Sequence, residues 1–136
     1  MRLEVTKRAE LAVRALAFLG TTPQRVKGSV LADELGTTSA FVGQVVGPLV
    51  KAGWVRSDPG PSGGYSNCVD LDQVSVLDVV EAVDGVTDTG RCVVVDRLCN
   101  SDSPCALHLA WTRARGELIK VLGAMSLADV TAETTL

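Results

Sequence analysis

The chain has 136 residues, of which 13 are Lys or Arg, 16 are Asp or Glu, one is His and four are Cys. With 46 % hydrophobic and 21 % charged residues it can form a sizeable core, which excludes an intrinsically disordered chain. No apolar run reaches the roughly 18 residues that a membrane-spanning helix needs, and the charged N-terminal segment excludes a signal peptide. We therefore expect a cytoplasmic protein with no membrane partner, in which cysteines bind metal or undergo redox chemistry.

The charge is divided unevenly along the chain. Residues 1–57 hold eight basic and four acidic side chains, whereas residues 58–136 hold five basic and twelve acidic ones. A polyanion such as nucleic acid would be attracted to the first segment and repelled by the second. Short segments also vary in charge by chance, so the asymmetry indicates a nucleic-acid partner only if the first segment has a matching architecture.

The first 52 residues have the pattern of a helix-turn-helix unit. Apolar residues at helical spacing predict helices over residues 7–19, 30–35 and 39–52. Gly20 is expected to end the first helix, and Ser29 to cap the second. A tight turn with a glycine joins the second and third helices, which is the arrangement that places the third helix in a DNA major groove.

A short hairpin and another helix follow. Residues 54–57 and 65–71 read as strands, and the Gly- and Pro-rich stretch between them must be a loop. A helix-turn-helix followed by such a hairpin is a winged helix. Ser75 and Asp78 have the spacing of a capping box, which predicts a helix from there to about Val83.

The remaining chain combines a loop with a long helix. Residues 86–104 show no periodicity, and Pro104 suits the first position of the helix that follows. Apolar residues along that helix alternate by four and three, as in a coiled-coil seam. They predict a dimer contact, although the same stripe could instead pack on its own domain. Ser126 and Asp129 repeat the capping-box spacing and begin a short last helix.

These elements predict a mainly α (α+β) fold in three parts. Residues 1–85 form a winged helix-turn-helix DNA-binding domain. Residues 86–104 form a cysteine-bearing loop, and residues 105–136 contain the dimerisation helix and a C-terminal helix.

Three cysteines fall close together, as C-x6-C-x5-C. They are Cys92, Cys99 and Cys105, and His108, the only histidine, follows one helical turn after the last of them. A helix N-terminus at Cys105 would favour the thiolate that binds metal. Three thiolates suit zinc or an iron–sulfur cluster, and the wide gaps favour a cluster over zinc. Cys68 lies on the predicted wing and is expected to be structural.

Other functions for the same cysteines remain open at this point. They could form a metal-free thiol switch, or a structural zinc site with His108. An enzyme with a reactive cysteine is not expected, because a Cys–His pair at this spacing lacks a third member and no oxyanion or substrate motif accompanies it.

Short motifs follow one another along nearly the whole chain. They are Met1-Arg2-Leu3, Glu10–Leu16, Gly36, Lys51-Ala52-Gly53, Gly60–Tyr65, Val83-Asp84-Gly85, Trp111 and Leu127–Val130. In this combination the chain resembles the Rrf-two family of winged helix-turn-helix transcriptional regulators, which includes the IscR and NsrR types of iron–sulfur sensor. A Gly-Gly-Tyr wing followed by three cysteines and a long helix makes the resemblance specific.

The resemblance implies a cofactor and its ligands. The protein would be a homodimer with one iron–sulfur cluster per subunit on Cys92, Cys99 and Cys105. The fourth ligand would be either His108, which implies a 2Fe–2S cluster, or Glu10 from the partner subunit, which makes 4Fe–4S more favourable. The segment around Glu10 is closer to the nitric-oxide-sensing group, so 4Fe–4S is favoured over 2Fe–2S.

A DNA interface follows from the winged-helix architecture. Residues at the front of the third helix would face base edges, and Gln44 can read adenine in a bidentate manner. Basic side chains and wing amides would hold phosphates. The complete set is Lys7, Thr38, Ser39, Ala40, Gln44, Lys51, Arg56, Ser62, Gly63 and Gly64. Two-fold symmetry predicts a roughly palindromic double-stranded operator.

Two features depart from the family pattern. Asp58-Pro59 occupies the stretch of the wing where familiar members carry a basic residue. Pro48, which costs roughly 3 kcal/mol inside a helix, predicts a kink or an early end of the third helix.

The expected function is a dimeric DNA-binding regulator, controlled by a cluster that senses nitric oxide, redox state or iron status.

Overall fold

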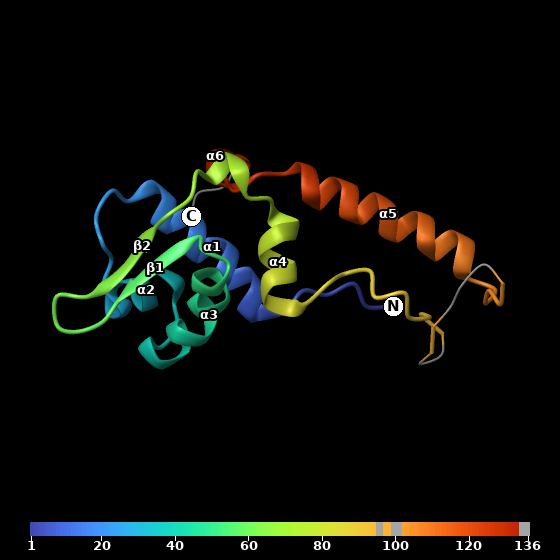
Figure 1. Ribbon diagram of the computed structural model, residues 1–136, viewed down its shortest axis with the longest axis horizontal. Helices are drawn as coiled ribbons and strands as arrows, with labels where there is room; N and C mark the ends of the chain where they lie inside the picture. Colours follow the sequence, from blue (N-terminus) through green and yellow to red (C-terminus); the bar gives the residue numbers. More distant parts are fainter. Residues whose placement is uncertain (95–96, 99–101, 134–136) are drawn as a thin grey trace.

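The computed structural model describes residues 1–94, 97–98 and 102–133, and it has the predicted mainly helical architecture. Figure 1 shows a winged domain with helix α5 projecting away from it. The elements in chain order are α1 (Lys7–Thr21), α2 (Gly28–Leu35), α3 (Ser39–Lys51), β1 (Val55–Asp58), β2 (Gly64–Asn67), a 3₁₀ turn η1 (Leu71–Gln73), α4 (Val76–Asp84), α5 (His108–Ala124) and α6 (Leu127–Glu133).

The hydrophobic core lies in the winged domain, which here comprises residues 1–85 together with α6. Helix α1 packs against α3, α4, α6 and β2, so it forms the centre of the domain. Leu16, Leu49 and Val79 from three of these helices are fully buried, as is Leu127 from α6. Burying such side chains supplies the main favourable free energy of folding, so this domain is stabilised by its own residues.

The end of α1 differs from the prediction. Gly20 does not stop the helix, which continues to Thr21 and is capped at Thr22. A Cβ at position 20 would lie 2.6 Å from Cγ of Leu71, which is too close for any real contact. Gly20 is therefore required by the packing of Leu71 on α1 rather than by chain termination.

The helix-turn-helix is confirmed, with two local corrections. Ser29 lies inside α2, whose N-cap is Lys27 without a side-chain hydrogen bond. Gly36 ends α2 in the left-handed conformation that favours glycine, at φ +67°. Helix α3 continues past Pro48 to Lys51, because Val46 and Leu49 on either side of the proline are anchored in the core.

The wing is an antiparallel hairpin with a third, single-residue partner. Val55 pairs with Asn67 and Asp58 with Gly64 in the β1–β2 register. Tyr65 exchanges two backbone hydrogen bonds of 2.8 Å with Val26, which precedes α2. The return strand is shorter than predicted, since η1 occupies Leu71–Gln73.

Two capping boxes position the last three helices. At the start of α4, Asp78 N donates to Ser75 Oγ and Ser75 N donates to the Asp78 carboxylate, as predicted. Ser126 and Asp129 exchange the same pair of bonds before α6. Backbone bonds between residues 74–76 and 125–127 then join the two helix starts, which fixes the C-terminal end of α5 to the winged domain.

Helix α5 begins at His108, not at Pro104. Residues 104–107 precede it, and His108 N donates to the Cys105 carbonyl at 3.2 Å. The cap residue, Leu107, offers no side-chain acceptor, so nothing extends the helix towards the proline. Cys105 therefore lies in the turn before α5 rather than on its first helical turn.

Candidate functional site

A small cavity at the N-terminal end of α5 contains two of the three predicted cysteines and the histidine. It has a volume of about 200 Å³, and Cys92, Cys105 and His108 all line it. Trp111 and Arg115 from the next turns of α5 complete one wall. Soft thiol donors and an imidazole at one cavity are a donor set that suits zinc or an iron–sulfur cluster.

Backbone pairing connects residues 91–92 with residues 97–98 beside the cavity. Cys92 N donates to the Arg97 carbonyl at 2.7 Å, and Arg91 pairs with Leu98. Cys92 Sγ accepts from Val94 N at 3.3 Å. A hydrogen bond from a backbone amide stabilises negative charge on the sulfur, and the thiolate is the form that binds metal.

An ion pair joins this segment to α5. The Arg115 Nη1 and Asp88 Oδ1 atoms lie 3.5 Å apart, and the Arg115 side chain is only 19 % exposed. Asp88 Oδ1 also accepts from Gly90 N at 3.1 Å. The contact holds the start of the cysteine segment against the helix that carries His108.

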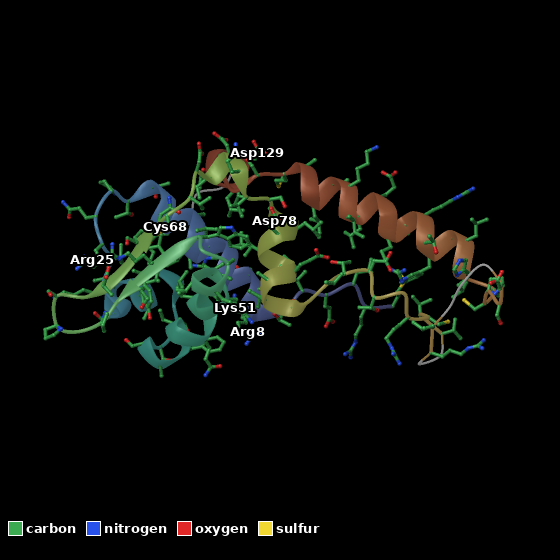
Figure 2. The ribbon with its side chains drawn as sticks, in the orientation of Figure 1. Arg8, Arg25, Lys51, Cys68, Asp78 and Asp129 are labelled. Carbon is green, nitrogen blue, oxygen red and sulfur yellow. The ribbon has the colours of Figure 1, made fainter. Side chains whose placement is uncertain are left out.

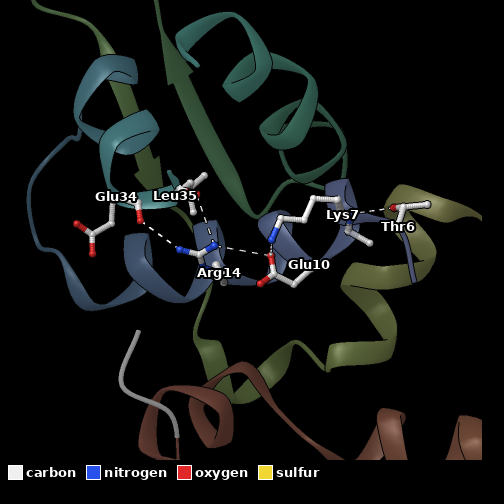
Figure 3. A network of polar contacts seen from close by, with 7 residues as sticks. Thr6, Lys7, Glu10, Arg14, Glu34 and Leu35 are labelled. Carbon is white, nitrogen blue, oxygen red and sulfur yellow. Dashed lines mark hydrogen bonds and ion pairs between the residues drawn. The ribbon is translucent and has the colours of Figure 1, made fainter. Parts of the chain in front are cut away.

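The two candidates for a fourth ligand occupy different places. His108 lines the cavity, whereas Glu10 lies on α1 and does not. Glu10 Oε2 lies 3.4 Å from Lys7 Nζ and 3.8 Å from Arg14 Nη1 (Figure 3). Arg14 in turn donates to the Glu34 and Leu35 carbonyls at the end of α2. Within one chain Glu10 thus belongs to a network beside the helix-turn-helix.

The predicted ligand set is only partly described. Cys99 lies outside the described residues. Among those that are described, no group of three His, Cys, Asp or Glu side chains is arranged to hold a metal ion. Cys68 is exposed at the end of the wing, where its N donates to the Trp54 carbonyl at 2.8 Å, and Figure 2 places it in the winged domain.

The predicted base-reading residues are exposed at the start of α3. Thr38 caps this helix by accepting from Phe41 N at 3.2 Å. Ser39, Ala40 and Gln44 are exposed, while Val42, Val45, Val46 and Leu49 face the core. Nothing lies within 4 Å of a Cβ at Gly43, so the outer face of the helix is unobstructed there. This geometry allows a close approach to a groove.

Some of the predicted phosphate contacts are exposed, and others are engaged in contacts within the chain. Lys7 and Lys51 are exposed, and Lys7 pairs with Glu10. In the wing, Gly63 N donates to the Gly60 carbonyl at 2.9 Å, so a phosphate at that amide would have to replace an internal bond. Ser62 is exposed, and its carbonyl accepts from Arg25. Arg25 was not predicted as part of the interface.

The comparisons with known proteins agree with this architecture. A family model named Rrf2, described as an iron-dependent transcriptional regulator, matches residues 5–133. The chain belongs to the Rrf2 family. The HTH-type transcriptional regulator MT1325 of Mycobacterium tuberculosis is 31 % identical over 130 residues, which are 94 % of this chain and 81 % of that protein. The regulator IscR of Xenorhabdus nematophila is 27 % identical, over 94 % of this chain and 79 % of its own.

Solved structures show the same fold. CymR of Bacillus subtilis, described as a global cysteine regulator, superposes with a TM-score of 0.79 at 21 % identity over 98 % of this chain and all of its own. IscR of T. potens superposes with a TM-score of 0.73 at 20 % identity, over 98 % and 93 % of the two chains. This Rrf2-family chain is therefore a helix-turn-helix transcriptional regulator and not an enzyme. None of the described helices is long and apolar enough to cross a membrane.

Proposed function

We propose that this Rrf2-family regulator binds a palindromic operator as a homodimer, and that an iron–sulfur cluster held by Cys92, Cys99 and Cys105 controls this binding. The convergence of Cys92, Cys105 and His108 on one cavity is the observation that carries the proposal. A bound cluster would supply iron that reacts with nitric oxide or oxidants. The favoured form is 4Fe–4S with Glu10 of the partner subunit as fourth ligand, and His108 is the alternative.

The exposed face of α5 supports the dimer. No residue of α5 is buried, and Leu118 and Val121 are exposed on it. Together with Leu3, Trp111 and Ala114 they line an apolar groove of about 610 Å³. A single helix of this length is marginally stable in water, so its apolar face must pack against another apolar surface. The α5 helix of a second copy matches this requirement by symmetry.

A chain of contacts leads from the cysteine segment to the DNA-binding domain. Thr87 N donates to the Glu81 carboxylate at 2.6 Å, which ties the segment to α4. At the end of α4, Asp84 accepts from Thr6 N at 3.2 Å and from Thr6 Oγ1 at 2.6 Å. Thr6 is the N-cap of α1, and Arg8 of α1 donates to the Val83 carbonyl. Release of the cysteine segment would therefore alter the position of α1, and with it the spacing of the two recognition helices.

The cluster assignment is tested by anaerobic purification, with iron, acid-labile sulfide and zinc counted per chain. The proposal predicts a coloured protein with iron and sulfide, and loss of both in Cys92→Ala, Cys99→Ala and Cys105→Ala. Cys68→Ala is the matched control, because Cys68 does not line the cavity, and it should keep the cluster. Iron and sulfide retained in all three variants would contradict the ligand assignment.

A metal-free thiol switch is the second candidate function. Cys92 and Cys105 line one cavity, so oxidation could join two of the cysteines. It predicts a colourless protein that contains no iron or sulfide and whose DNA binding changes with a thiol oxidant. Stoichiometric zinc without sulfide would instead indicate a structural metal site.

A further inference from the structure

The wing carries a carboxylate that two arginines neutralise. Asp58 Oδ2 lies 3.3 Å from Arg25 Nε, and Asp58 Oδ1 lies 3.1 Å from Arg56 Nε. Oδ2 is buried and accepts no hydrogen bond from the described residues, so the Arg25 guanidinium is its charge partner. A buried carboxylate oxygen without a nearby cation would be costly, and Asp58 therefore holds Arg25 at this position.

Arg25 is fixed from a second side by the wing loop. Its Nη1 donates to the Ser62 carbonyl at 2.8 Å. The segment that carries Arg25 presses against the wing, since a Cβ at Gly64 would lie only 3.0 Å from Arg25 Cγ and would collide with the Val26 backbone. Figure 2 shows Arg25 beside the β1–β2 loop, at the end of the molecule opposite α5.

The orientation leaves part of the guanidinium available. Arg25 uses Nε and Nη1 for Asp58 and Ser62, while Nη2 bonds to nothing in the described part of the chain. The side chain is 44 % exposed. Two arginines and one carboxylate leave one net positive charge at the wing. A planar guanidinium with fixed orientation is well suited to contact phosphate oxygens.

We propose that Arg25, from the connection between α1 and α2, is a further residue through which the wing contacts the DNA phosphate backbone, and that Asp58 and the Ser62 carbonyl position it. The wing needs such a contact because Asp58 places a negative charge in the hairpin itself, and the Gly63 amide is already bonded internally. The inference rests on DNA binding but does not depend on what the cysteines hold.

The salt dependence of DNA binding tests this assignment. A duplex is first selected from a randomised library with the wild-type protein, and its affinity is then measured over a range of salt concentrations. Each phosphate contact contributes about 0.9 to the slope of log affinity against log salt. Arg25→Gln should lower that slope by about this amount and weaken binding roughly five- to tenfold.

Two further variants separate a contact from a purely structural role. Arg25→Lys keeps the charge but loses the planar guanidinium that pairs with Asp58 and donates to the Ser62 carbonyl, so it should bind more weakly with the wild-type slope. Arg2→Gln removes the same charge from a side chain that is 87 % exposed on the N-terminal segment, and it should leave slope and affinity unchanged.

Two results would overturn the inference. One is a wild-type slope for Arg25→Gln, and the other is an equal loss of slope in Arg25→Gln and Arg25→Lys. A wild-type protein that selects no duplex would instead contradict DNA binding itself, and the inference with it.

Discussion

The winged domain and the cysteine-bearing arm, residues 86–125, are stabilised in different ways. Among the described residues, every buried apolar side chain except Leu127 lies between Ala9 and Val83, and α5 has none. The DNA-binding half is therefore complete within one chain. The described residues of the arm form an apolar face and a thiol-lined cavity but contribute no buried apolar side chain.

The largest expected effect on the free energy of unfolding comes from a substitution in the core of the winged domain. Leu16→Ala removes a fully buried side chain from α1 and should lower the free energy of unfolding by about 2–5 kcal/mol. Leu109→Ala, at a side chain that is 63 % exposed on α5, should change it by less than about 0.5 kcal/mol. Urea denaturation of the two variants measures both values. Equal losses would contradict the division into a self-sufficient domain and an arm.

The proposed role of the arm in dimerisation is tested by measuring the oligomeric state of the protein. Val121→Asp places a charge on the exposed apolar face of α5 and should weaken the dimer at least about tenfold. Sedimentation equilibrium measures this change, and the unfolding transition of the winged domain should persist in the monomer. Lys120→Ala, at the adjacent exposed position, should leave the dimer intact. A Val121→Asp variant that stays fully dimeric would exclude α5 as the interface.

The Ser75–Asp78 capping box provides a finer test of the winged domain. Ser75→Ala removes the N-cap bond of α4, a core helix of the winged domain, and should cost about 1 kcal/mol of stability. Thermal or urea unfolding measures this loss. Asp78→Ala should cost a similar amount, because Asp78 supplies the reciprocal bond to Ser75 N. The paired assignment would fail if the double variant lost as much as the two single variants added together.

A small stability effect is expected from the ion pair at the wall of the cavity. Asp88→Asn weakens the ion pair with Arg115, and because Asp88 is exposed it should cost at most about 1 kcal/mol. For the proposed cluster, the same variant should nevertheless show faster release of iron to a chelator, because Asp88 holds the cysteine segment against α5. Unchanged release kinetics would show that the ion pair has no role at the site.

Local signals in the sequence were sufficient to predict much of the fold. The Ser75–Asp78 box predicted the start of α4 correctly, because its two hydrogen bonds join residues within one turn. Gly20 was misread, because its role is set by Leu71, which is distant in sequence. The start of α5 was placed too early on the strength of Pro104 alone.

The site was predictable in its residue types but not in its arrangement. The spacing predicts one site for Cys92, Cys99 and Cys105. The structure brings Cys92, Cys105 and His108 to one cavity, and Cys99 lies outside the described residues. Arg25 could not be found in the same way, since its contacts with Asp58 and Ser62 join separate elements. The signal that could have pointed to it is Asp58 itself, a carboxylate in a hairpin expected to approach DNA.

The central claim is that the state of the cysteine site controls DNA binding. Its most direct test measures the affinity of the anaerobically purified protein for a selected duplex, before and after removal of the cluster, at one fixed salt concentration. The account predicts a change of about 5- to 150-fold, the range typical of coupled sites. The change should be absent in Cys105→Ala and retained in Cys68→Ala. Equal affinities of the cluster-loaded and cluster-free protein would contradict the account.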